Sequence, residues 1–147
     1  MTKAFEFRLE KVLDLRRLKE EAAQRAFAAA QQAVADRNQA ILVLMTEEDE
    51  VRNCLRDAQQ RSVEIQKLRL AAGCLVALER RLGREYDALQ EQVKVEMEKR
   101  RLLTEARKDV RVLERLREKQ LGVYRQELDR DERKFLDEVG QNLAKGA

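Results

Sequence analysis

Apolar side chains recur three and four residues apart along two long stretches of this chain. The first stretch keeps this spacing from about residue 5 to 61, and the second from about 67 to 141. Such spacing places the apolar side chains on one face of an α-helix. The pattern therefore predicts an all-α fold: a single long antiparallel two-helix coiled-coil hairpin, with a turn at about residues 62–66 and a longer second helix that overhangs at its carboxyl end.

Few residues in the chain favour turns or a globular core. It has no proline, only five glycines, no tryptophan and 4% aromatic residues, whereas 40% are Asp, Glu, Lys or Arg. This composition is typical of long helices and coiled coils. Intrinsic disorder is the competing interpretation of so much charge, but 44% of the residues are hydrophobic and regularly spaced, which disfavours it.

The apolar spacing also predicts which residues face the partner helix. In the first helix the seam is expected to slip by one residue around Asp36, as drift between 3.5 and 3.6 residues per turn allows. Its expected members are Phe5, Val12, Leu15, Ala22, Ala26, Ala29, Ala33, Ile41, Leu44, Val51, Leu55 and Ala58. In the second helix they are Leu75, Leu82, Tyr86, Leu89, Val93, Leu103, Val110, Leu121, Tyr124, Leu128 and Phe135.

Charge pairing favours one of two possible turns, the polar stretch Asp57 to Ser62 over Gly73. A fold near residue 64 opposes the acidic residues 47–50 to Arg80, Arg81 and Arg84, and it opposes residues 20–21 to residues 107–108. A fold at Gly73 would instead oppose acidic residues to each other, which is unfavourable in coiled coils.

A turn at this point leaves residues 124–147 without a partner in the same chain. This extension nevertheless continues the apolar stripe through Leu128, Phe135 and Leu136. An apolar stripe with no internal partner indicates an external one. Self-association or fraying of the extension is the alternative.

The sequence offers little for catalysis. It has no histidine, no glycine-rich phosphate loop and two cysteines without metal-ligand spacing. We therefore expect no enzyme activity, no catalytic, cofactor-binding or metal-binding residues, no cofactor and no small-molecule substrate. The 31 basic and 28 acidic residues are interspersed, so no nucleic-acid partner is expected. Without a membrane span or a signal-peptide core, a cytoplasmic location is expected, with Cys54 and Cys74 as reduced thiols packed like small apolar residues.

Three segments carry a resemblance to a known family. The stretch FEFRLEKVLDLRRLKEEAAQRAFAAA (residues 5–30) resembles the amino-terminal signature of the FliJ family of the bacterial flagellar export apparatus. LERRLGREYDAL (residues 78–89) and LREKQLGVYRQELDRDERKFLDEVGQN (residues 116–142) continue it in order, over nearly the whole chain. The resemblance implies a non-enzymatic stalk that couples ATP hydrolysis to flagellar protein export and is needed for flagellum assembly and motility.

The resemblance also implies partners. In the family, the end that bears both termini inserts into the hexameric flagellar export ATPase, and the hairpin end contacts the cytoplasmic domain of the membrane export gate, at the cytoplasmic face of the inner membrane. Export chaperones are a weaker partner. The ATPase-facing residues would be Phe5, Arg8, Leu9, Leu13, Leu128, Phe135 and Leu136, and the gate-facing residues Leu44, Val51 and Leu78. A generic homo-oligomeric coiled-coil scaffold, or the equivalent stalk of a virulence-type secretion system, is the alternative.

Overall fold

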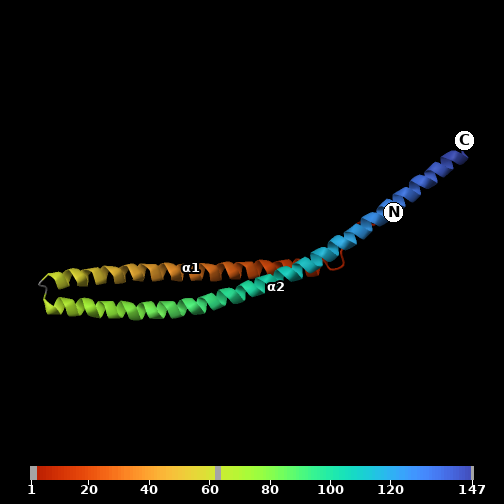
Figure 1. Cartoon of the computed structure of the whole chain (residues 1–147). Coiled ribbons are helices and arrows are strands. Elements are labelled where there is room, and N and C mark those ends of the chain that lie inside the picture. Colours follow the sequence, from red (N-terminus) through yellow and green to blue (C-terminus); the bar gives the residue numbers. More distant parts are fainter. Residues whose placement is uncertain (1–2, 62–63, 147) are drawn as a thin grey trace. The chain divides into compact units, whose positions relative to one another are not determined.

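The chain folds into two long helices joined by a short connection (Figure 1). The computed structural model describes residues 3–61 and 64–146. Helix α1 spans Glu10–Gln60 and helix α2 spans Ile65–Lys145, and no strand occurs in the described parts of the chain. The two helices pack against each other, so the predicted all-α helical hairpin is confirmed.

The helix ends differ by a few residues from the predicted ones. Helix α1 begins at Glu10 rather than near residue 5, and α2 continues to Lys145 rather than ending near 141. Of the turn expected at about residues 62–66, residues 62–63 lie outside the described part. Glu64 precedes α2, and its carbonyl accepts a hydrogen bond from the amide of Lys67 at 3.1 Å.

The chain divides into two compact units, and each contains a stretch of both helices. The terminal unit comprises Met1–Ala22 and Thr104–Ala147, and the hairpin unit comprises Ala23–Leu103.

The core of the terminal unit lies where the start of the chain meets α2. Phe7, Leu13, Val110 and Leu113 form a buried cluster, with Phe5, Leu9 and Leu116 packed against it. Leu13 has no exposed surface. Complete burial of a leucine side chain contributes about 1.5–3 kcal/mol, so this cluster fixes the position of α1 against α2 within the unit.

The hairpin unit has its own small core. Ile41, Leu44 and Leu82 are buried together, and Leu78 and Leu89 pack against them. Elsewhere in the unit, alanines and charged residues occupy much of the interface.

Ion pairs across the two helices report their register. In the terminal unit Arg107 lies 3.9 Å from Glu20, a pairing that the charge pattern predicted. In the hairpin unit Arg37 binds Glu85 at 2.6 Å. This register is that of a connection between Gln60 and Ile65, and it leaves Gly73 inside α2.

The acidic residues 47–50 do not pair as expected. Arg80, Arg81 and Arg84 are exposed, and none of the ion pairs described for the hairpin unit joins them to this cluster. Glu48 is instead buried at the seam and pairs with Arg52 of its own helix, which also lies 3.5 Å from Glu79. The prediction failed because it treated Glu48 as a flanking residue.

The first half of the predicted seam of α1 is wrong in part: Ala26 and Ala33 are half-buried as expected, but other members are exposed. Val12 and Leu15 are 39% and 53% exposed, and the alanines at 22 and 29 are exposed too. The observed seam needs no slip at Asp36. It comprises residues 9, 13, 16, 20, 23, 27, 30, 34, 37, 41, 44, 48, 51, 55 and 58, all buried or half-buried. In α2, Tyr86, Val93 and Phe135 are likewise exposed rather than in the seam.

Candidate functional site

The chain reaches α1 through residues 3–9, which we call the terminal segment. Residues 3–7 lie outside any helix, and residues 8–9 form a turn into α1 that is closed by the hydrogen bond from the Glu10 amide to the Phe7 carbonyl at 3.1 Å. Burial alternates along the terminal segment: Phe7 is buried, Phe5 and Leu9 are half-buried, and Glu6 and Arg8 are exposed. Alternation with a period of two is that of an extended chain, which advances about 3.3 Å per residue instead of the 1.5 Å of a helix. The terminal segment therefore covers more of α2 than a helix of the same residues would.

Aromatic contacts hold this segment against α2. The rings of Phe5 and Tyr124 have centroids 5.6 Å apart at an interplanar angle of 47°. The Tyr124 hydroxyl donates a hydrogen bond to the carbonyl oxygen of Lys3. Tyr124 was expected to lie beyond any partner in the same chain, and the structure corrects this because the extended segment reaches it.

Arg117 links the terminal segment to the start of α1. Its Nε donates a hydrogen bond of 3.0 Å to the Glu10 carboxylate, and its guanidinium carbon lies 5.6 Å from the centroid of the Phe5 ring. Glu10 is in the first turn of α1, where a negative charge also interacts favourably with the helix dipole. Arg117 therefore contacts both the terminal segment, through Phe5, and the first turn of α1, through Glu10.

A groove of mixed character lies beside these contacts. It is lined by the terminal segment on one side and by α2 on the other, through Lys3, Ala4, Phe5, Glu6, Tyr124, Glu127, Leu128 and Asp131. Its carboxylates lie next to apolar surface from Phe5 and Leu128. Leu128 is half-buried, so it is partly covered within its own chain.

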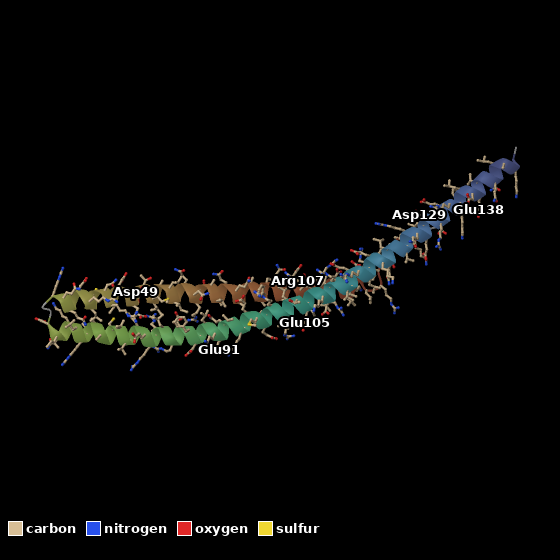
Figure 2. All side chains as sticks on the ribbon, in the orientation of Figure 1. Asp49, Glu91, Glu105, Arg107, Asp129 and Glu138 are labelled. Atoms are coloured by element: carbon tan, nitrogen blue, oxygen red, sulfur yellow. The ribbon has the colours of Figure 1, made fainter. Side chains whose placement is uncertain are left out.

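Beyond Leu128 no residue of α2 is buried or half-buried in the described part of the chain. Every residue from Asp129 to Gly146 is exposed, and we call residues 129–146 the overhang. Phe135, Leu136 and Leu143 expose 64%, 66% and 71% of their surface. Figure 2 shows Asp129 and Glu138 on this part of α2.

The structure brings some of the predicted ATPase-facing residues together and separates others. Phe5 and Leu9 pack on the cluster that buries Leu13, so Leu13 holds the fold and offers no surface to a partner. Arg8 is exposed beside that cluster. Phe135 and Leu136 stand apart on the overhang, fully available to a partner.

The predicted gate-facing residues lie mostly inside the hairpin unit. Leu44 is buried in its core, Leu78 packs against that core, and Val51 is half-buried. The exposed apolar side chains nearest the connection are instead Ile65 and Leu70, at 67% and 78% exposure.

One carboxyl group among the described residues has a displaced pKa. The pKa of the Glu98 carboxyl is held below its ordinary value, chiefly by hydrogen bonds from Arg101 at 2.6 and 3.1 Å. This pair lies three residues apart on the open face of α2. Across the described residues, no group of three or more His, Cys, Asp or Glu side chains could hold a metal ion. Neither helix contains, in its described part, a stretch long and apolar enough to cross a membrane.

Sequence reasoning missed two features of the site. The extended terminal segment was assigned to the first helix, although Phe5, Phe7 and Leu9 alternate with charged residues, which is the signal for an extended chain. No role was assigned to Arg117 from the sequence. Only its contacts with Phe5 and Glu10 reveal that it organises the terminal unit.

The helical hairpin, with a bare and partly apolar end of its second helix, defines a two-helix coiled-coil protein. A family model described as "Flagellar FliJ protein" matches residues 5–147. The chain therefore belongs to the FliJ family, a family of non-catalytic components of the flagellar protein export apparatus. Neither the curated proteins nor the solved structures include a significant match to it.

Proposed function

We propose that this protein is the stalk of the flagellar export apparatus, with the terminal unit inserted into the ring of the hexameric export ATPase. The observation that carries the proposal is the overhang, where Phe135, Leu136 and Leu143 remain exposed. Large apolar side chains left uncovered in this way mark a protein interaction site. Family membership supports a place in the flagellar export apparatus, and the ATPase is the partner that we propose there.

The dimensions and chemistry of the terminal unit suit such a partner. Two paired helices are about 20 Å across and a single helix about 10–12 Å, so the overhang is the narrower part to enter a central hole. Phe135 and Leu136 would be anchors, each contributing about 1.5–3 kcal/mol on burial before association costs. The exposed Arg8 and the acidic groove beside Phe5 would contact the rim of the ring.

The hairpin unit would then contact the cytoplasmic domain of the export gate at the inner membrane. Because Leu44 is buried in the core, we propose that the contact uses exposed apolar side chains near the connection, Ile65 and Leu70. Export chaperones would be secondary partners. The variant Leu70→Ala would test the contact. It should weaken binding of the hairpin unit to the isolated gate domain and leave helicity unchanged.

The experiment for the ATPase contact removes residues 132–147 and measures stimulation of ATP hydrolysis by the purified export ATPase. This cut keeps Leu128 and the groove residue Asp131, so the terminal unit retains its core. We expect stimulation and motility to be lost while helicity per residue stays the same. Full stimulation by the truncated protein would refute the proposal.

Point variants separate the apolar anchors from the helix that carries them. Phe135→Asp combined with Leu136→Asp should abolish stimulation, whereas Lys134→Ala, an exposed position at the same level of the helix, should retain it. Equal loss in both variants would show that the overhang acts without its apolar stripe.

A further inference from the structure

Two cysteines, Cys54 and Cys74, lie on different helices of the hairpin unit. Both are exposed free thiols. The expectation that they pack as small apolar residues is therefore wrong.

Cross-helix contacts identify one edge of the helix pair in this unit. The Tyr86 hydroxyl lies 3.8 Å from the Met45 sulfur, and Arg52 lies 3.5 Å from Glu79. Met45 and Arg52 are seven residues apart, so they occupy the same face of α1. These contacts mark the first edge, on one side of the seam.

Both thiols belong to the second edge. Cys54 follows Arg52 by two residues, a rotation of about 200° at 100° per residue. Cys74 precedes Glu79 by five residues, a rotation of about 140° in the other sense. Each rotation carries the side chain across the seam to the opposite side. The second edge is also where Arg37 crosses to Glu85 and Gln92.

The two thiols also lie at the same level along the pair. In an antiparallel pair, residues whose numbers have the same sum lie opposite each other. The sums for the cross-helix contacts in this unit run from 122 for Arg37 and Glu85 to 131 for Arg52 and Glu79. The sum for Cys54 and Cys74 is 128, inside this range.

The spacing between the helices is slightly wider than a disulfide spans, so closing the bond requires the two helices to move together locally. With axes 8–10 Å apart and Cα atoms about 2.3 Å from each axis, two residues on the same edge have Cα atoms about 7–9 Å apart. Disulfides span Cα separations of about 4.4–6.8 Å. Ala58 and Ala71 are half-buried and lie nearer the connection. Because alanine adds little bulk between the helices, these residues allow an axis separation at the short end of the 8–10 Å range.

We propose that Cys54 and Cys74 are a dithiol pair that a small disulfide such as glutathione disulfide converts into an intramolecular bond. One thiolate attacks a glutathione sulfur, which forms a mixed disulfide and releases one glutathione. The second thiolate attacks the protein sulfur of that mixed disulfide, which closes the bond between the two cysteines and releases the second glutathione. The pair loses two electrons and two protons, and the small disulfide is reduced. The bond joins α1 to α2 beside their connection and fixes the register there.

The test equilibrates the full chain, at low concentration, in buffers of increasing glutathione disulfide. We expect loss of both free thiols, an intact mass lower by two hydrogen atoms, monomer mobility on non-reducing gels, and an effective concentration on the order of millimolar or higher. The thermal unfolding midpoint should rise by several degrees and return to its starting value with a reductant. Chains that carry glutathione, or that are joined to each other, would overturn the proposal.

A matched control moves one thiol by a heptad along the same edge. In the chain with Cys54→Ser and Glu47→Cys, both exposed positions, the two thiols are about 10 Å further apart along the axis. This variant should form mixed disulfides with glutathione instead of an internal bond. Equal closure in the variant and the native chain would contradict the assigned register and the proposal with it.

Discussion

Arg117 of α2 contacts two residues near the start of the chain. It binds Glu10 at 3.0 Å and lies over the Phe5 ring. Both ion-pair partners are more than a third exposed, so solvent screening reduces the pair to well under 1 kcal/mol, and the ring contact adds about 0.5–1 kcal/mol.

We expect Arg117→Ala to lower the free energy of unfolding by about 1 kcal/mol, measured by urea titration. It should also increase protease cleavage within residues 3–9, because the terminal segment loses its arginine contact. Arg115→Ala, at an exposed position on the same helix, is the control and should change neither. An unchanged cleavage rate in Arg117→Ala would show that Tyr124 and the buried cluster around Phe7 hold the segment without Arg117.

Glu98 allows a titration prediction for a single carboxyl group. Hydrogen bonds from Arg101 lower its pKa. A lowered folded-state pKa means that the pair stabilises the helix above the unfolded-state pKa and that this contribution is lost as pH falls through the folded-state pKa. In Arg101→Ala the pKa of Glu98 should rise towards its ordinary value, as carbon-detected NMR would show. An unchanged pKa of Glu98 in this variant would mean that the Arg101 guanidinium does not cause the lowered value.

At the scale of the helices, the sequence predicted the fold better than the seam. The spacing of three and four residues was sufficient for two long helices and their pairing. The seam of the first half of α1 was misassigned because charged residues, Arg16 and Glu20, occupy seam positions while Val12 and Leu15 lie outside it. Long side chains bury their stems and keep their charged ends in water, so hydrophobicity alone does not identify them.

The candidate site was predictable in part, for the same physical reason. An exposed apolar stripe with no internal partner can be found from spacing, and Phe135 and Leu136 are indeed exposed. The groove at Leu128 was not predictable from helical spacing, because it depends on five residues of extended chain before α1. Contacts made by an extended segment follow from tertiary packing rather than from the period of a helix.

Helix α2 contains glycines that the fold does not require. No other heavy atom lies within 4 Å of the position that a Cβ would take at Gly73 or Gly83. Glycine in a helix interior costs up to about 1 kcal/mol relative to alanine. Gly83→Ala should therefore raise the free energy of unfolding by about 0.5–1 kcal/mol, as measured by chemical denaturation. A decrease would indicate that the helix bends at this glycine.

The overhang should be the least protected part of α2. Its residues have no packing across the interface, and helical segments of this length are marginal on their own in water. We expect backbone amides from 132 to 145 to exchange with deuterium far faster than those near Val110 and Leu113, which are buried. Adding the export ATPase should slow exchange in the overhang. Slow exchange in the free protein would indicate self-association, which dilution would then reverse.

At the scale of the whole molecule, charge is abundant but balanced. The chain carries 31 basic and 28 acidic residues, and cross-helix ion pairs in both units set the register rather than supply most of the stability. Such exposed pairs contribute little individually, and the buried clusters of leucine, isoleucine, valine and phenylalanine are small. A protein of this kind gains order when a partner covers its remaining apolar surface.

The absence of histidine makes the pH dependence of the whole chain unusually simple. With no histidine among 147 residues, no side chain has an unperturbed pKa between about 5 and 8. Stability changes with pH only where the folded and unfolded states bind different numbers of protons. The thermal unfolding midpoint should therefore be flat from about pH 6 to 8, and it should fall in acid as carboxylates protonate and 31 positive charges repel one another. Calorimetric scans across this range test the prediction, and a titration centred near pH 7 would reveal a carboxyl or thiol whose pKa the fold displaces strongly.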